Sequence, residues 1–424
     1  MMRILVISNL YPPHHLGGYE MACREVVKGL SARGHEVRVL TSTYGLEKPA
    51  IDGEVYRWLT TDLEREPKPL ARRALELLGK EARNQQAFKR VVKEFRPELV
   101  YFWNLANISV SLALSAQRMR LPVCYYNFDL WLTNWRSDNW LALWPPAPRR
   151  RAVRLASRAA RSTLETVGIL SSGVLDLRHV QFATHYLKRS TLEAGEPVAG
   201  AEVIQWGIEV EKFPYKAHGG EPARLLFVGQ VVPHKGVHTA LEALRILVQE
   251  HGRSGVTLTI AGGSSLPDYV SELRRFVQTH RLEGNVEFCG HVAHEHLPEV
   301  YRAHDILLFP SIIDEGLGLG ILEAMASGLV VLGTASGGSA EILEHERTGL
   351  VFPKEDAVTC AAHVLRLIGD RGLFEYLRRN GRRMVDERFR VERAVDEIEH
   401  SLQAQLAEVA RESLTPAHAP GNLP

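Results

Sequence analysis

The chain has 424 residues, of which 45% are hydrophobic and 24% are charged, and its formal net charge is +1. This length is too great for one ordinary hydrophobic core, and the balance of acidic and basic residues does not indicate nucleic-acid binding. The four cysteines contain no C-x-x-C pair, so neither a disulfide framework nor a zinc ribbon is expected. The composition is typical of a cytoplasmic globular enzyme with two large domains.

The first half predicts alternating strands and helices. The apolar run Ile4–Ser8 is too short for a signal-peptide core and predicts a first strand. A helix over Tyr19–Leu30 and a strand over Glu36–Ser42 complete a β-α-β unit. No stretch approaches the roughly 20 apolar residues of a membrane-spanning helix. Further strands, separated by helical segments such as Arg72–Phe95, are expected at Leu99–Trp103, Pro122–Asn127, Thr166–Leu170 and Ala201–Gln205.

The second half repeats this pattern, because the run Arg224–Gly229 has the same character as Arg3–Ser8 and also leads into a loop with proline and then a helix. Alternation of strands and helices predicts an α/β protein with parallel sheets. The expected domains are residues 1–210 and 211–392, with a hinge near Trp206–Pro222, a charged helix at about 393–412 and a flexible tail at 413–424. Later strands are expected at Val256–Ala261, Val286–Cys289, Asp305–Phe309, Val330–Gly333 and Gly349–Phe352.

The segment Asp314–Glu323 is the strongest indication of chemistry. Glu315 and Glu323 stand eight positions apart around a glycine-rich turn, and we expect Glu323 on the first turn of a helix. Free backbone amides at a helix N-terminus bind a diphosphate well, and carboxylates accept hydrogen bonds from sugar hydroxyls. By itself the segment is also compatible with an ordinary strand-to-helix turn carrying two solvated glutamates. The amides in question belong to Gly316, Leu317, Gly318 and Leu319.

This segment resembles the E-x7-E motif of glycosyltransferase family 4, which comprises retaining enzymes of the GT-B fold. The following EAMASG, the pair Gly337-Gly338 and the run Thr348-Gly349-Leu350 also match, and the resemblance spans nearly the whole chain. It implies two Rossmann-like domains facing each other across a deep cleft, with the donor on the C-terminal domain and the acceptor on the N-terminal one. It also implies that Glu315 contacts the transferred sugar, that Glu323 contacts the ribose, and that the last helix returns to the first domain.

The loop Phe227–Gly236 resembles the G-R-x(n)-K-G pattern of the same family. The resemblance implies that Lys235 neutralises the β-phosphate of the departing nucleotide, although a lysine at a helix start is often only a solvated charge. Gln230 stands where the family usually has arginine, which removes one expected positive charge, and His234 offers partial compensation.

The loop after the first strand contains Gly17 and Gly18 and resembles the Gly-Gly loop of the family, which implies contact with the donor. Glycine permits close approach of the backbone to a ligand, but an ordinary β-α turn also uses such pairs. On the acceptor side, Asn104 and Asp129 follow predicted strands. Asp129 is a candidate base for the acceptor hydroxyl or a structural aspartate, and Phe128 stands where many members have histidine.

Metal binding is not expected. His291, His294 and His296 lie within six positions, but no carboxylate or cysteine with ligand spacing accompanies them. The family resemblance instead implies that the run Phe288–His291 lies beside the nucleotide base. The chain contains no Asp-x-Asp sequence, so we expect no metal and no other cofactor, with Lys235 and backbone amides meeting the phosphate charge.

A basic stretch between the two glycine-rich regions is compatible with three roles. A basic amphipathic helix can contact an anionic membrane peripherally, here on the inner face, but a solvated helix face or a site for an anionic acceptor is equally compatible. The arginines are Arg149, Arg150, Arg151, Arg154, Arg158 and Arg161.

Taken with the resemblance, these patterns predict a retaining, metal-independent hexosyltransferase that moves a sugar from a nucleotide diphosphate to a hydroxyl acceptor. The acceptor class stays open among a glycan, a lipid-linked sugar and a small molecule, in bacterial-type polysaccharide or glycoconjugate synthesis. The alternatives are a nucleotide-sugar epimerase, a phosphorylase, or a non-catalytic nucleotide-sugar-binding protein of the same fold. Gln230 and Phe128 keep the non-catalytic alternative open.

Overall fold

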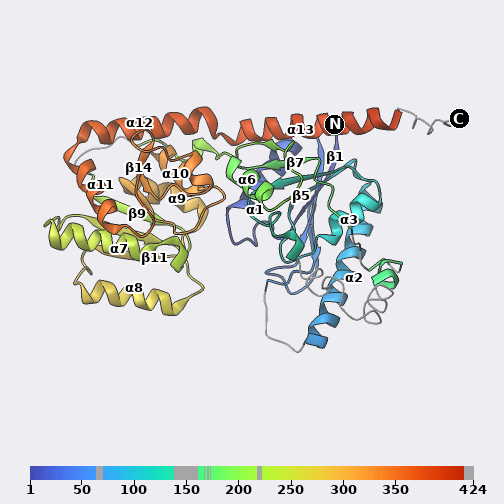
Figure 1. The fold of residues 1–424 in the computed structure, drawn as a ribbon, viewed down its shortest axis with the longest axis horizontal. Coiled ribbons are helices and arrows are strands. Elements are labelled where there is room, and N and C mark those ends of the chain that lie inside the picture. Colours follow the sequence, from blue (N-terminus) through green and yellow to red (C-terminus); the bar gives the residue numbers. More distant parts are fainter. Residues whose placement is uncertain are drawn as a thin grey trace. The chain divides into compact units, whose positions relative to one another are not determined.

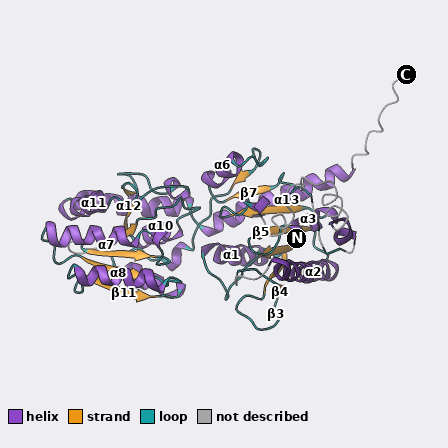
Figure 2. Ribbon diagram, turned by 60° about the horizontal axis from the view of Figure 1, so that its bottom comes forward, coloured by secondary structure: helices purple, strands orange, loops and turns teal. Residues whose placement is uncertain are grey.

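A computed structural model describes residues 1–63, 70–137, 161–166, 168–169, 171, 173–216 and 222–414. The chain divides into two compact units. The first contains Met1–Ala183, Leu187–Ile204 and the described residues from Val395 onward, and the second contains Thr184–Tyr186 and Gln205–Ala394. Each unit has its own predominantly parallel sheet with helices packed around it (Figures 1 and 2).

The first unit contains an eight-stranded sheet in the order β3-β4-β2-β1-β5-β6-β7-β8. The pair β3 and β4 is antiparallel, and the other described pairs are parallel. The strands are β1 (Arg3–Ser8), β2 (Glu36–Ser42), β3 (Ala50–Asp52), β4 (Val55–Leu59), β5 (Leu99–Asn104), β6 (Val123–Asn127), β7 (Val180–Phe182) and β8 (Glu202–Val203). The helices are α1 (Gly18–Ala32), α2 (Leu70–Phe95), α3 (Ser111–Arg118), α6 (His185–Glu193) and α13 (Val391–Leu414).

The last helix, α13, is attached to the first unit by polar contacts along its length. Arg33, at the end of α1, forms an ion pair with Asp396 and places its Nε 3.1 Å from a carboxylate oxygen of Glu399. The same carboxylate lies 2.8 Å from Nε2 of His35. Further along the helix, Gln405 donates to the backbone of β6 at 2.8 Å. The C-terminal helix is therefore an integral layer of the N-terminal unit.

The second unit contains a six-stranded parallel sheet in the order β11-β10-β9-β12-β13-β14. Counted along the unit, this is the order 3-2-1-4-5-6 of the dinucleotide-binding Rossmann fold. Its strands are β9 (Arg224–Val228), β10 (Thr257–Ala261), β11 (Val286–Gly290), β12 (Ile306–Phe309), β13 (Val330–Gly333) and β14 (Gly349–Val351). Its helices are α7 (Val237–Arg245), α8 (Pro267–Thr279), α9 (Leu297–Ala303), α10 (Leu319–Ser327), α11 (Ala357–Gly369) and α12 (Arg371–Arg388).

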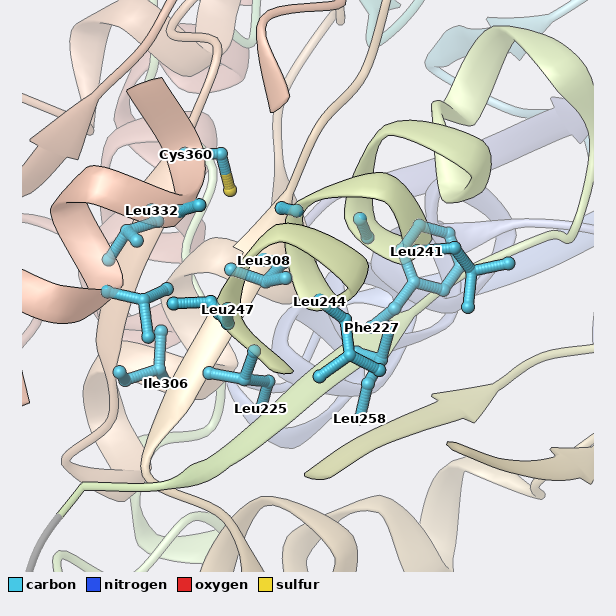
Figure 3. Packing of buried hydrophobic residues seen from close by; sticks show 14 of the residues in the cluster. Leu225, Phe227, Leu241, Leu244, Leu247, Leu258, Ile306, Leu308, Leu332 and Cys360 are labelled. Atoms are coloured by element: carbon cyan, nitrogen blue, oxygen red, sulfur yellow. The ribbon is translucent and has the colours of Figure 1, made fainter. Parts of the chain in front are cut away.

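The strands of the second unit are near-continuous apolar runs because helices cover the sheet on both faces. One face packs against α7, α8 and α11 in a core of buried side chains (Figure 3). Intervening residues such as Leu226 and Leu307 are equally buried and point to the opposite face, against which α10 packs. Burial of each large aliphatic side chain stabilises the unit by about 1.5–3 kcal/mol. The core includes Leu225, Phe227, Leu241, Leu244, Leu258, Ile306, Leu308 and Cys360.

The prediction of a strand at Thr166–Leu170 is wrong, because none of the described residues in this range lies in a strand. Residues 161–166 are helical, and Gly168 and Ile169 lie in a turn and a bend. An ion pair at i, i+4 between Arg161 and Glu165 is compatible with a helix and not with a strand. The place beside β6 is taken by β7, which is only three residues long and pairs with Tyr125–Asn127.

Asp305, the residue before β12, joins the sheet to the segment that enters the second unit. Its buried carboxylate accepts hydrogen bonds from Lys216 at 3.0 Å and from the guanidinium of Arg224 at 2.8 and 3.0 Å. Burial by itself raises the pKa of Asp305, but the hydrogen bonds from Arg224 and Lys216 outweigh it and lower the pKa to about 2. This carboxylate is therefore bound in its ionised form.

Asp305→Asn is expected to destabilise the second unit by about 2–4 kcal/mol, because it leaves the buried Lys216 without a counter-charge. Since the folded-state pKa of Asp305 is depressed to about 2, its stabilisation is present above about pH 4 and is lost as the pH falls towards 2. Urea unfolding measured against pH checks both statements. Asp176→Asn, which breaks a partly exposed pair with Arg178, is the control and should cost less than about 1 kcal/mol. Equal losses in the two variants at pH 7 would contradict the prediction.

Candidate active site

The second unit has its topological switch point between β9 and β12, where connections leave the sheet in opposite directions. Ligands of open α/β sheets bind at such a point, beyond the carboxyl ends of the strands. The loops that follow these two strands, residues 229–236 and 310–318, are in direct contact. The amide of Ile312 donates to the carbonyl of His234 at 2.9 Å, and the hydroxyl of Ser311 contacts the same carbonyl at 3.4 Å.

Gly236 makes this contact sterically possible. Its φ is +70°, in the left-handed region that favours glycine, and a Cβ at this position would lie 1.9 Å from the carbonyl oxygen of Pro310. The residue also ends a short 3-10 turn and caps α7. The glycine therefore fixes the position of Lys235, which immediately precedes it.

Lys235 and Glu315 form an ion pair where the two loops meet. The lysine Nζ lies 2.7 Å from one carboxylate oxygen of Glu315 and 2.9 Å from the other, so the contact is bidentate. Ser311 also donates its hydroxyl to this carboxylate. Both charged side chains remain partly exposed, at 25% for Lys235 and 12% for Glu315, so solvent and a ligand have access to them.

A third loop, after β13, holds the backbone of Glu315. The amide of Gly338 donates to the Glu315 carbonyl at 2.6 Å. Gly337 has φ +64°, and a Cβ there would lie 2.5 Å from the same carbonyl oxygen. The Gly337-Gly338 pair thus lets the two backbones approach closely and prevents the Glu315 loop from moving away.

The helix α10 begins at Leu319 with Gly318 as its N-cap. Glu323 is therefore the fifth residue of the helix and lies in its second turn, and the prediction of a first-turn position is wrong. The physical reason is that regular helix begins directly after the Gly318 N-cap, earlier than a first-turn position of Glu323 would require. The first amides of a helix have no partner one turn back. Here the Ile321 amide donates to the Gly318 carbonyl at 2.9 Å, so the amides that precede Ile321 are the ones that can meet a ligand.

Glu323 is almost fully buried, with 6% of its surface exposed. One carboxylate oxygen accepts the Tyr301 hydroxyl at 2.8 Å, and the other lies 3.0 Å from Nε2 of His294. Burial and the neighbouring Glu323 charge raise the pKa of Tyr301 well above its usual range, so this phenol remains a donor. Both partners come from the segment that precedes β12.

Gln230 and His291 lie on the same carboxyl edge of the sheet. Gln230 is an exposed residue of the loop after β9, next to Gly229. His291 is exposed and follows β11. A Cβ added to Gly263, in the loop after β10, would lie 3.5 Å from the Cβ of His291. The residues predicted for the diphosphate, the sugar and the base thus come from loops of one sheet edge.

In the first unit, Asn104 and Asp129 are brought together at the ends of β5 and β6. The Asn104 side chain donates to one Asp129 oxygen at 2.7 Å, and the Trp131 amide donates to the other at 2.8 Å. Burial raises the pKa of Asp129 to about 6, against the opposing effect of these two hydrogen bonds and with a contribution from the charge of Glu20. An aspartate with this pKa changes its protonation state near neutral pH.

Gly17 and Gly18 lie at the start of α1 in the first unit, whereas the other residues predicted for the donor lie in the second. Gly17 is the N-cap, and its amide and that of Leu16 each donate to the buried Glu20 carboxylate at 3.1 Å. Burial raises the pKa of Glu20. Next to it, the Tyr19 hydroxyl donates to the Asn9 side chain at 2.5 Å. The glycine loop is thus anchored by its own helix.

Several supporting residues are not apparent from the sequence. Ser311, Tyr301 and His294 contact the two glutamates but lie outside the E-x7-E segment or have no motif of their own. Arg57 is buried in β4 and donates to the carbonyl of Tyr11 at 2.9 Å, which holds the loop after β1. A single arginine within the strand Val55–Leu59 is the only indication of this role in the sequence.

The histidine and arginine clusters of the sequence raised a metal site and a membrane contact as further alternatives. Across the described ranges, His, Cys, Asp and Glu side chains do not gather in groups of three or more that could hold a metal ion. Arg149, Arg150, Arg151, Arg154 and Arg158 lie outside the described residues, and Arg161 pairs with Glu165 at 3.4 Å. No helix among the described residues is both long enough and apolar enough to cross a membrane.

Two Rossmann-type sheets, one of which carries a lysine–glutamate pair and a helix N-terminus at its switch point, define the class of GT-B glycosyltransferases. Residues 210–384 match the family described as glycosyl transferases group 1, and residues 17–177 match the glycosyl transferase 4-like domain. The chain therefore belongs to the family 4 glycosyltransferases. This confirms the family and the fold class predicted from the sequence.

Individual proteins with similar sequences or folds agree with this assignment. An amylovoran biosynthesis glycosyltransferase of Erwinia amylovora is 33% identical over 41% of this chain, a stretch that covers only 43% of that protein. The GDP-mannose-dependent α-(1-6)-phosphatidylinositol monomannoside mannosyltransferase of Mycobacterium tuberculosis is 26% identical over 92% of this chain and 95% of its own length. The structure of HepE from Anabaena with UDP and glucose covers 95% of this chain and 100% of its own, with a TM-score of 0.68 and 19% identity.

Gly236→Ala is expected to destabilise the second unit by about 2–4 kcal/mol, because it combines left-handed backbone strain with a clash against Pro310. Gly284→Ala is the matched control, since a Cβ there has no atom within 4 Å and the backbone is not left-handed. The control should change stability by less than about 1 kcal/mol. Thermal unfolding of both variants measures the difference, and unchanged stability of Gly236→Ala would show that the two loops do not constrain each other.

The stability of the wild type relative to Asp129→Asn is expected to depend on pH. The folded-state pKa of Asp129 is raised to about 6, so the folded state holds its proton more tightly than the unfolded chain between about pH 4 and 6. As the pH rises through this window, the wild type loses about 1–3 kcal/mol relative to the variant. Urea unfolding at pH 4, 5, 6 and 7 follows this loss. A constant difference between the two proteins would mean that Asp129 titrates normally.

Proposed function

We propose that this protein is a retaining glycosyltransferase that moves a hexosyl group from a nucleotide diphosphate sugar to a hydroxyl acceptor. The observation that carries the proposal is the bidentate contact of Lys235 with Glu315 at the switch point, beside the start of α10. A cation, a carboxylate and free amides in one place are the groups that a sugar diphosphate requires. The names of the GDP-mannose-dependent relative and of the UDP-bound structural neighbour support a donor of this kind.

When the donor binds, the ion pair separates: Lys235 contacts the phosphate and Glu315 contacts the sugar. The β-phosphate takes the Lys235 ammonium and the amides from Gly316 to Leu319, while the released Glu315 carboxylate accepts hydroxyls of the sugar. Because both side chains are already held beside each other, little rearrangement is needed when the diphosphate enters. The same positive groups stabilise the diphosphate as it departs, and this is the main electrostatic contribution to the reaction.

The remaining donor contacts follow from the same sheet edge. Glu323 accepts the ribose hydroxyls, and the backbone near Gln230 and His291 lies beside the base. We propose that no metal takes part, because the chain has no Asp-x-Asp sequence and Lys235 with the α10 amides supplies the positive charge.

The acceptor hydroxyl is placed by the first unit, at Asn104 and Asp129. With its pKa raised to about 6, Asp129 is largely ionised at neutral pH and is able to receive the proton of the hydroxyl. Asn104 holds the carboxylate in place through a hydrogen bond of 2.7 Å. The acceptor is a glycan, a lipid-linked sugar or a small molecule of bacterial-type polysaccharide or glycoconjugate synthesis.

The proposed location is the cytoplasm, with peripheral contact of the Arg149–Arg161 stretch with the inner face of the membrane. Clustered arginines attract anionic lipid headgroups. Pelleting with anionic and with neutral liposomes tests this part, and equal recovery in both supernatants would remove it. The transfer reaction does not depend on this contact.

Lys235→Ala and Glu315→Gln are each expected to reduce turnover by about 100- to 1000-fold, because each removes a group that binds the developing charge or the sugar. Lys354→Ala is the matched control, since Lys354 forms an ion pair of the same 2.7 Å length with the neighbouring Asp314. A thermal-shift screen over nucleotide diphosphates and their sugars first identifies the donor. Slow hydrolysis of that donor then gives a rate without a known acceptor. Full activity in either site variant would refute the donor-site assignment.

The product distinguishes the alternatives. A retaining transferase forms a product with the same anomeric configuration as the donor sugar, whether the sugar goes to an acceptor or to water. The NMR spectrum of the first product shows this configuration, and EDTA does not slow the reaction. An epimerase gives an isomeric nucleotide sugar and requires no acceptor. A non-catalytic binding protein, which Gln230 and Phe128 keep open, gives a thermal shift but releases no nucleotide.

A further inference from the structure

Glu323 is held from two sides by side chains that the E-x7-E motif does not contain. Tyr301 donates to one oxygen at 2.8 Å and His294 lies 3.0 Å from the other. Tyr301 is fully buried, whereas the His294 side chain is 37% exposed at the surface of the site. The Glu323 carboxylate thus lies between the buried Tyr301 hydroxyl and the partly exposed His294 imidazole.

We propose that His294 is a positioning residue which, through Glu323, gives this protein its recognition of the ribose 2′- and 3′-hydroxyls of the donor. The inference rests on the proposed function, in which Glu323 accepts these hydroxyls. It adds a specific residue and a specific part of the nucleotide to that function.

The lone pairs of the carboxylate account for the geometry. Each oxygen of Glu323 accepts two hydrogen bonds, and one of them is already used by Tyr301 or by His294. One acceptor position therefore remains on each oxygen, which matches the two neighbouring hydroxyls of a ribose. A carboxylate cannot donate, so the imidazole donates from Nε2 in this contact.

The orientation of His294 is fixed by packing as well as by hydrogen bonding. Phe213 places its ring edge-on to His294 at 6.1 Å and edge-on to Tyr301 at 5.9 Å. Because one buried phenyl ring packs against both donors, the two cannot turn away from Glu323 independently. Without His294, the second oxygen is solvated and the Glu323 carboxylate can rotate. Binding of the ribose must then fix this side chain, and the lost conformational entropy weakens binding.

The experiment compares nucleotides with and without the two hydroxyls. Binding of UDP, GDP and their 2′,3′-dideoxy forms is measured by calorimetry for the wild type, His294→Ala and His294→Gln. His294→Ala should weaken ribonucleotide binding by about 10-fold, the effect of one charge-assisted hydrogen bond, and leave dideoxynucleotide binding unchanged. Glutamine also donates a hydrogen bond, so His294→Gln should recover most of the loss.

Two further variants separate positioning from a structural role. Tyr301→Phe removes the other donor without creating a cavity and should also reduce the preference for ribose. In a Glu323→Ala background, His294→Ala should have no further effect, because the group through which it acts is gone. His296→Ala, in the same exposed turn, is the control and should bind both forms of nucleotide like the wild type.

The outcomes distinguish this inference from the proposed function. If the wild type prefers ribonucleotides but His294→Ala weakens both forms equally, or neither, the positioning role is refuted and the donor site stands. If the wild type binds ribo- and dideoxynucleotides with equal affinity, the assignment of Glu323 to ribose fails and the inference fails with it. If no nucleotide binds, the proposed function itself is refuted.

Discussion

The close backbone contact between the loops after β9 and β12 is the constraint on which the candidate donor site depends. These strands are neighbours in the sheet but are separated by about 80 residues of sequence, since the intervening chain builds β10 and β11. Their loops meet because the connections leave in opposite directions, and they meet closely because Gly236 carries no side chain against Pro310. Lys235 and Glu315 then face each other across a distance that neither loop could fix without the other.

The strands of the chain could be predicted well because buried parallel strands are short, continuous apolar runs bounded by turn residues. Short or polar elements could not. The hairpin of β3 and β4 lies at a sheet edge, and β7 has only three residues. The strand predicted at Thr166–Leu170 begins where a helical segment at 161–166 ends. Local pattern says little in such cases, because packing against neighbouring strands decides the outcome.

The site shows the same division between local and long-range information. The Lys-Gly and E-x7-E segments identified which residues to examine, but their mutual contact joins residues 80 positions apart and follows only from the sheet order. The start of α10 was predicted too late because glycine permits both loop and helical conformations, so the glycine-rich run does not mark where the loop ends. His294 and Tyr301 had no motif, since their importance arises from a carboxylate 22 to 29 residues further along the chain.

The attachment of α13 to the first unit has a consequence for the order in which the chain folds during synthesis. The second unit is complete in sequence at Ala394, and its parallel sheet can form as soon as that residue has left the ribosome. The first unit begins at residue 1 but lacks one of its layers until the residues after Val395 have been made. The surface of α1 and β6 that α13 covers is therefore exposed for most of translation, and the unit made first is the last to be finished.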